Sequence, residues 1–191
     1  MLSAEFEASK TRSTNRITLR LPNSILEKLK KEAERKDIPL NATITRILSK
    51  TTTYDIEFNA IPTITMSHVL FSKIINSIDD VTLEKIADEG PDMIRKLFTI
   101  IGIEYELDQI IQSYFVMFSK YCGWFKFNYE INQTKYRFVF ETPLGAKWTK
   151  FLIMYVRNIL DSLKIHIDTE SIHDNVILFE FRSCEIRFDT K

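Results

Sequence analysis

The side chains best suited to metal binding or acid–base chemistry are scattered through this 191-residue sequence. The histidines are His68, His166 and His173, and the cysteines are Cys122 and Cys184. Their spacing matches no familiar zinc pattern, in which ligands come in close pairs such as Cys-x-x-Cys. The two later histidines flank an acidic loop that could hold a metal ion weakly or respond to pH, but solvated or capping side chains are the simpler interpretation. We therefore expect no metal and no cofactor.

Catalytic arrangements are equally hard to find. The sequence contains no nucleophile elbow, no Cys/His pair at a telling spacing and no paired-carboxylate motif. Its four glycines form no glycine-rich phosphate cradle. The sequence therefore gives no support for an enzyme, and we predict that the protein is not one.

The cellular compartment can be inferred from the cysteines and from apolar stretches. Two distant cysteines without a secretory leader argue against a disulfide framework and for a reducing environment. No stretch approaches the roughly 18 apolar residues of a membrane span, and the first fifteen residues are polar. We expect a cytoplasmic protein without a membrane partner.

Charge is divided unevenly along the chain, although the formal net charge is zero. Residues 16–50 hold nine Lys or Arg against four acidic residues, a net of +5, whereas residues 51–191 hold fifteen against twenty, a net of −5. With 45% hydrophobic and 27% charged residues, the chain has ordinary globular composition. The basic segment can therefore bind nucleic acid even though the whole chain is neutral.

The basic segment opens with alternating side chains. Residues 16–22 place polar and apolar side chains on opposite sides, which predicts a short, half-buried strand that ends at Pro22. Such a strand has no partner within its own segment, and unpaired backbone donors and acceptors are costly. About 35 residues also cannot bury an adequate core alone. Antiparallel pairing of two copies satisfies both needs, so we predict a homodimer or a higher assembly.

Two helices are predicted after this strand. Asn23 or Ser24 can cap the first helix, and Pro39 cannot continue it. Asn41 is placed to cap the second helix. The predicted dimer core combines the apolar positions of the strand and of both helices, which are Ile17, Leu19, Leu21, Leu29, Ile44, Ile47 and Leu48.

The string RITLRLPNSILEKLKKEAERKDIPLNATITRIL, residues 16–48, resembles the ribbon-helix-helix family of prokaryotic repressors, the MetJ and Arc type. In that family two strands form an antiparallel ribbon in the major groove of DNA, and the helices of both subunits interlock beneath it. The resemblance covers about 35 of the 191 residues. It implies a β-ribbon that reads a palindromic site in double-stranded DNA.

The resemblance also assigns roles to individual residues. It places Arg16, Thr18 and Arg20 on the face toward the groove, where Arg can bond guanine O6 and N7 and Thr can contact a thymine methyl group. The start of the second helix would contact a DNA phosphate, which fixes register rather than sequence. The residues implied there are Asn41, Ala42 and Thr43.

The turn between the two helices departs from the family pattern. The family usually has glycine there, or another residue comfortable with positive φ, whereas this turn reads Lys36, Asp37, Ile38, Pro39. Asp37 tolerates left-handed geometry better than most residues. The alternative to DNA binding is an amphipathic strand-helix-helix that serves dimerisation alone, with its charges solvated.

The remaining chain predicts an α+β domain. We expect a flexible arm at 1–15, the DNA-binding module at 16–53, a linker at 54–65 and the α+β domain at 66–191. Aromatic residues are dense from Tyr114 to Tyr155, and core packing explains them better than a ligand pocket or base stacking. The expected elements are helices at Met66–Ser77, Leu83–Gly102 (broken at Gly90 and Pro91) and Leu107–Tyr121, a hairpin of Trp124–Ile131 and Tyr136–Glu141, a long helix capped by Thr142 and Pro143, and strands at Asn175–Phe181 and Glu185–Phe188.

These features favour a dimeric, sequence-specific DNA-binding protein of a prokaryote, a transcriptional regulator of repressor type. Its α+β domain would sense a small-molecule effector or add oligomer contacts. The alternative is an antitoxin or partition-type protein whose C-terminal domain binds a protein partner. Many such antitoxins end in a disordered tail, whereas this C-terminus has the pattern of a folded domain, so we rank the alternative second.

Overall fold

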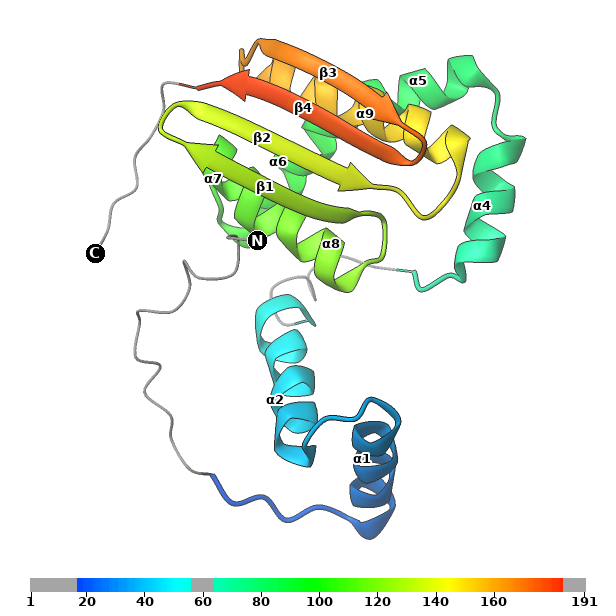
Figure 1. Cartoon of the computed structure of the whole chain (residues 1–191), viewed down its shortest axis with the longest axis vertical. Coiled ribbons are helices and arrows are strands. Elements are labelled where there is room, and N and C mark those ends of the chain that lie inside the picture. Colours follow the sequence, from blue (N-terminus) through cyan, green and yellow to red (C-terminus); the bar gives the residue numbers. More distant parts are fainter. Residues whose placement is uncertain (1–16, 56–63, 184–191) are drawn as a thin grey trace. The chain divides into compact units, whose positions relative to one another are not determined.

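The computed structural model describes residues 17–55 and 64–183 and divides into two compact units, Met1–Leu48 and Ser49–Lys191 (Figure 1). Helices and strands are both present, so the chain is of the α+β class. Four predicted features lie wholly or largely outside the described residues: the arm at 1–15, Arg16, the linker at 54–65 and the strand at Glu185–Phe188.

The first unit contains two helices, α1 (Asn23–Arg35) and α2 (Leu40–Lys50). Residues 17–22, which we predicted to be a strand, form none in the single chain. The physical reason is that a strand is stabilised by hydrogen bonds to a neighbouring strand, and this segment has no neighbour among the described residues of one chain. The prediction of a strand is thus wrong for the isolated chain.

The turn between α1 and α2 is built around Asp37, which has φ of 51°. The amide of Ile38 donates to the carbonyl of Ala33 at 3.1 Å, and that of Asp37 donates to Glu34, also at 3.1 Å. This pair of bonds closes the helix end in a Schellman motif, which needs a left-handed residue at the position of Asp37. The prediction that Asp37 replaces the usual glycine is confirmed.

The predicted helix caps are wrong in both cases. The N-cap of α1 is Pro22, whose carbonyl accepts from the amides of Ile25 and Leu26, and Asn23 is already helical. Helix α2 begins at Leu40, so Asn41 lies in its first turn rather than before it. Pro22, with ψ of 142°, directly precedes α1, and no side chain caps the start of the helix.

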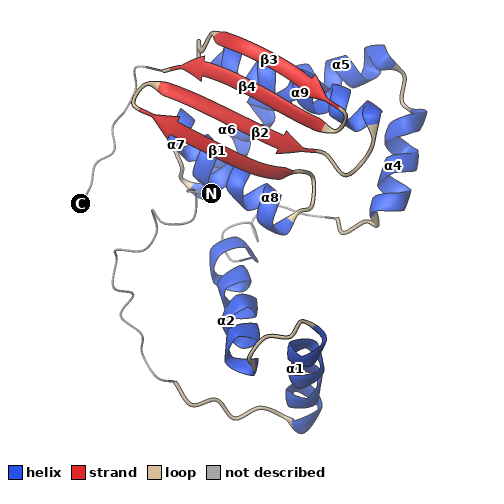
Figure 2. Ribbon diagram, viewed as in Figure 1, coloured by secondary structure: helices blue, strands red, loops and turns tan. Residues whose placement is uncertain are grey.

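The second unit packs helices on one side of an antiparallel sheet (Figure 2). All three predicted helical regions between residues 66 and 121 are confirmed, including the break at Gly90 and Pro91. The centre of the third region is π-helical, which was not predicted. None of the helices in the described parts of the chain is long and apolar enough to cross a membrane. The helices before the sheet are η1 (Thr51–Asp55), α4 (His68–Ser77), α5 (Asp80–Asp88), α6 (Gly90–Ile101), α7 (Leu107–Gln109), η2 (Ile110–Val116) and α8 (Met117–Tyr121).

The sheet has the order β1-β2-β4-β3, and each neighbouring pair is antiparallel. Strands β1 (Lys126–Asn132) and β2 (Lys135–Glu141) form the predicted hairpin, whose turn places Gln133 at φ of 56°. The strand predicted at Asn175–Phe181 is confirmed as β4 (Val176–Arg182).

Strand β3 (Ile167–His173) corrects the prediction of an acidic loop between the two later histidines. It is an edge strand with a polar surface and a bulge, and it pairs with β4 through a turn at Asp174 (φ 53°). Only a few of its side chains are apolar, because an edge strand has fewer neighbours to pack against and charged side chains protect its open edge. Its pattern therefore resembles that of a loop.

The long helix α9 (Ala146–Ser162) is confirmed, but its predicted cap is not. Gly145, with φ of 91°, precedes the helix. The Thr142 hydroxyl is instead buried at 2.6 Å from the hydroxyl of Thr149 and donates to the carbonyl of Asn175 at 3.1 Å. Thr142 thus links the start of α9 to the turn of the β3–β4 hairpin through hydrogen bonds.

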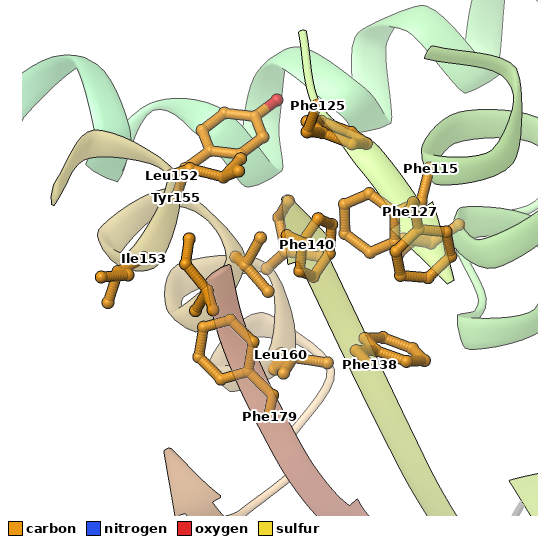
Figure 3. Close-up of a cluster of buried hydrophobic side chains, with 14 of the residues drawn as sticks. Phe115, Phe125, Phe127, Phe138, Phe140, Leu152, Ile153, Tyr155, Leu160 and Phe179 are labelled. Atoms are coloured by element: carbon orange, nitrogen blue, oxygen red, sulfur yellow. The ribbon is translucent and has the colours of Figure 1, made fainter. Parts of the chain in front are cut away.

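The core lies between the sheet and the helices and is rich in aromatic residues, which confirms the packing interpretation of the aromatic residues. Figure 3 shows Phe115 from η2 meeting Phe127, Phe138 and Phe140 from the sheet, all nine-tenths or more buried. Most of these rings meet edge to face, the favoured geometry for aromatic pairs. Tyr155 of α9 lies in the same core.

We predict that Gly90→Ala destabilises the second unit. A Cβ atom at Gly90 would lie 2.6 Å from Cδ2 of the buried Tyr155 ring. Glycine-to-alanine changes in helices usually stabilise by up to about 1 kcal/mol, but overpacking a core costs about 1–3 kcal/mol. Denaturant unfolding of the full chain should show a loss of about 1–3 kcal/mol, with exposed Lys96→Ala of α6 as the control. A variant as stable as the parent protein would contradict this packing.

Candidate nucleic-acid interface

The segment before α1 presents both faces of its alternating pattern to solvent. Thr18 and Arg20, which we predicted to contact bases, are exposed, and Arg16 lies outside the described residues. On the apolar side, Ile17 is 77% exposed and Leu19 is 53% exposed. Large apolar side chains at this exposure are costly in water, so a single chain leaves this segment incomplete.

The helices of the first unit also leave apolar side chains exposed. Among the other residues predicted for the dimer core, Leu21, Leu29 and Ile44 are half-buried, and Ile47 and Leu48 are exposed. Ile25 of α1, which the prediction omitted, is exposed as well. Ala33 and Thr43 are the fully buried residues in the described part of this unit. Two helices of one chain therefore bury little of their apolar surface.

The three residues predicted to contact a phosphate at the start of α2 differ in exposure. Asn41 and Ala42 are exposed, but Thr43 is 0% exposed, and its amide already donates to the carbonyl of Pro39 at 3.0 Å. The Thr43 hydroxyl is buried without a hydrogen-bond partner. Neither polar group of Thr43 is available to a phosphate in this structure, so a phosphate contact would fall to Asn41 and Ala42.

Glu32 of α1 forms ion pairs with three basic residues of the first unit. Its carboxylate lies 2.8 Å from Arg35 and 2.7 Å from Lys36, and 3.5 Å from Arg46 of α2. The hydrogen bonds from Lys36 and Arg35 lower the pKa of Glu32 from 4.5 to about 2. Glu32 thus joins the two helices electrostatically and holds three cations on one side of the module.

In the second unit the histidines and cysteines, which could bind a metal, lie on different elements. His68 lies on α4, His173 on β3, and Cys184 lies outside the described residues. No group of three or more metal-binding side chains occurs in residues 17–55 and 64–183. The acidic residues between the later histidines are partly used, because Glu170 lies 2.7 Å from Arg157 and Asp168 lies 3.6 Å from Arg182.

Two tyrosine contacts could not be predicted from the sequence. The Tyr54 hydroxyl of η1 lies 2.9 Å from the sulfur of Cys122, where burial raises the pKa of both groups. The hydroxyls of Tyr114 and Tyr155 meet at 2.6 Å in the core, where burial raises their pKa values as well. A thiol with a raised pKa is a poor nucleophile at neutral pH. With raised pKa values the thiol and the three hydroxyls stay protonated at neutral pH, so both contacts join uncharged groups.

One hollow of about 520 Å³ lies on the polar side of the sheet. Its lining carries positive and negative charges in equal number, with Arg137 3.6 Å from Glu180 and 3.9 Å from Glu130. The dense aromatic residues lie in the core rather than around a large apolar cavity. The lining side chains are Glu130, Asn132, Lys135, Tyr136, Arg137, Asp168, Thr169, Glu180, Phe181 and Arg182.

Comparison with known proteins gives one match, at the start of the chain. Residues 3–51 match the family model described as the CopG antitoxin of type II toxin-antitoxin systems. The match spans well under half of the chain, and it supports a relationship to the ribbon-helix-helix proteins for this segment alone. No curated protein matches the chain. The family match does not extend to residues 52–191.

We predict that Glu32→Gln loosens the C-terminal end of α1, where Arg35 and Lys36 pair with this carboxylate, and with it the contact to Arg46 of α2. A carboxylate whose folded pKa is lowered contributes stability above its ordinary value of 4.5, and this contribution is lost as pH falls toward about 2. Amide hydrogen exchange in α1 and α2 should therefore be faster in Glu32→Gln than in the parent protein at pH 6. The difference should shrink toward pH 2.

The matched control is Glu27→Gln, because Glu27 pairs with Lys30 within α1 and does not join the helices. Its exchange should stay close to that of the parent protein. Equal exchange in the parent and Glu32→Gln at pH 6 would show that the carboxylate contributes nothing to the two-helix unit.

Proposed function

We propose that the protein is a dimeric DNA-binding regulator whose N-terminal segment pairs with that of a second copy to form a β-ribbon. The observation that carries this proposal is the match of residues 3–51 to the CopG antitoxin model. The exposed apolar side of residues 17–21 supports it, because a second copy would cover Ile17 and Leu19 and supply the missing strand. The basic balance of residues 16–50 favours a DNA partner.

In this proposal the ribbon enters the major groove with Arg16, Thr18 and Arg20 toward the bases. Exposure of Thr18 and Arg20 is consistent with that role. Two symmetry-related copies of three side chains read a palindromic site. Asn41 and Ala42 at the start of α2 contact the flanking phosphates through the helix N-terminus. The ribbon thus recognises the base sequence, and α2 positions the protein on the DNA backbone.

The second candidate is an antitoxin, because the matching family is described as one of antitoxins. The same module would then regulate its own operon, and residues 49–191 would bind a toxin. This part has a large buried core, unlike a short tail that folds on its partner. The two candidates differ in whether a gene beside this one encodes a protein that is toxic alone and harmless when both are expressed.

We predict that Arg20→Ala removes sequence discrimination while the dimer persists. A bidentate arginine–guanine contact contributes about 1–3 kcal/mol of discrimination, and a dimer would contain two copies. Binding to a selected duplex and to a scrambled duplex should be measured by fluorescence anisotropy at one fixed salt concentration. The ratio of the two affinities should fall by more than about tenfold.

Lys28→Ala is the matched control, because Lys28 is an exposed cation on α1 away from the ribbon. Losing it should weaken binding to both duplexes equally and leave their ratio unchanged. An unchanged ratio in Arg20→Ala would remove this residue from the reading face. A monomeric Arg20→Ala protein would instead assign it to dimerisation.

A further inference from the structure

The C-terminal end of α1 and the middle of α2 gather three cations around one carboxylate. Nζ of Lys36 and a guanidinium nitrogen of Arg46 both approach Oε1 of Glu32, at 2.7 Å and 3.5 Å. Arg35 donates to both oxygens of the same carboxylate, at 2.8 Å to Oε2 and 3.0 Å to Oε1. We call these four residues the Glu32 cluster. With three positive charges and one negative charge, the cluster has a net charge of +2.

The positive charge of the Glu32 cluster faces the solvent. Hydrogen bonds from Lys36 and Arg35 lower the pKa of Glu32 to about 2, so this carboxylate is ionised at neutral pH and offsets one of the three cations. The Glu32 side chain is 30% exposed, whereas those of Arg35 and Arg46 are 70% and 51% exposed. The carboxylate is thus the more covered group, and the excess positive charge is available to an anion outside the protein.

Arg46 lies on the side of α2 that the predicted dimer core leaves free. It is two residues from both Ile44 and Leu48 of that core, and two residues turn a helix by about 200°. Four residues separate Arg46 from Ala42, so these two side chains lie on the same side of α2, one turn apart. Helical side chains lean toward the N-terminus of their helix, so the Arg46 guanidinium lies on the Ala42 side of its own Cα. Pairing of two copies through the predicted core therefore leaves this cation accessible.

A DNA phosphate is the anion that suits this cluster. Guanidinium groups bind phosphate oxygens through paired N–H bonds, and ammonium groups bind them as point charges. In the proposed function Asn41 and Ala42 contact the DNA backbone at the start of α2. Arg46 is one helical turn, about 5.4 Å, further along the same side of that helix. The cluster is therefore within reach of the same stretch of backbone.

We propose that the Glu32 cluster is a second phosphate-binding site of the DNA-binding module, in which Lys36 and Arg46 bind the DNA backbone beside the start of α2. This inference rests on the proposed function. The ion pairs with Glu32 hold the two cations side by side. A phosphate contact contributes affinity for any duplex and no discrimination between sequences, so the cluster acts separately from the ribbon.

The test measures how DNA binding by the full chain depends on salt. Arg46→Gln and Lys36→Gln each remove one cation per protomer and keep a polar side chain. Each phosphate contact contributes about 0.9 to the slope of log K against log salt, and a dimer would lose two contacts. Fluorescence anisotropy at several salt concentrations, with a duplex selected from a random pool, should give a slope smaller by about 1.8 in either variant. The ratio of affinities for the selected duplex and a scrambled one should not change.

Lys30→Gln is the matched control, because Lys30 is an exposed cation of α1 that pairs with Glu27 outside the cluster. Its slope should equal that of the parent protein. Circular dichroism and sedimentation establish that each variant folds and dimerises like the parent. A parent-like slope in either Arg46→Gln or Lys36→Gln would overturn the second phosphate site, and so would an equal fall in Lys30→Gln.

Neutral DNA linkages locate the contact directly. A methylphosphonate removes the charge of one phosphate, and it is placed at successive positions along the selected duplex. At one position in each half-site the parent protein should lose affinity, and Arg46→Gln should lose at least about threefold less than the parent there. Equal losses in the parent and in Arg46→Gln at every position would overturn the inference.

These results separate the inference from the function on which it rests. A parent protein that selects a DNA sequence, with a parent-like slope in either variant, removes only the second phosphate site. A parent protein that binds no duplex removes the DNA-binding regulator as well. Binding of an acidic protein at the cluster would leave the salt slope for DNA unchanged, which overturns the proposal.

Discussion

The backbone of residues 17–22 imposes the main constraint on this protein. An extended segment with alternating side chains exposes a row of amide and carbonyl groups and an apolar side, and two short helices cannot cover both. Ile17 and Leu19 remain mostly exposed in one chain, and Ile47 is exposed on α2. Pairing with an identical segment satisfies the hydrogen bonds and the apolar surface at once. The dimer, the ribbon and the DNA-reading face of the proposed function all depend on this pairing.

The second unit is not subject to this constraint. Residues 49–191 form a compact unit with a buried core of their own. The neutral chain joins a basic N-terminal segment to an acidic domain, and in the proposed function only the basic segment binds DNA.

The sequence predicted most where local chemistry decides the structure. Asp37 at the left-handed turn, the break at Gly90 and Pro91, and the β1–β2 hairpin were all predictable from residue type and spacing. Strand β3 was not, because its polar edge position removes the alternation that identifies a strand.

In the candidate site, the exposure of Thr18 and Arg20 was expected, but the burial of Thr43 was not. A threonine in the first turn of a helix looks available for a phosphate, and only the packing of α1 against α2 shows that it faces inward. The network around Glu32 and the contact of Tyr54 with Cys122 also depend on three-dimensional packing. Spacing along the chain contains no signal for them.

The most direct test of the account is selection of bound duplexes from a random DNA pool with the purified full-length protein. A ribbon made of two identical strands predicts enrichment of one short palindrome, because symmetry-related copies of the same side chains read both half-sites. Enrichment of no sequence, with binding that depends only on salt, would contradict a sequence-reading dimer.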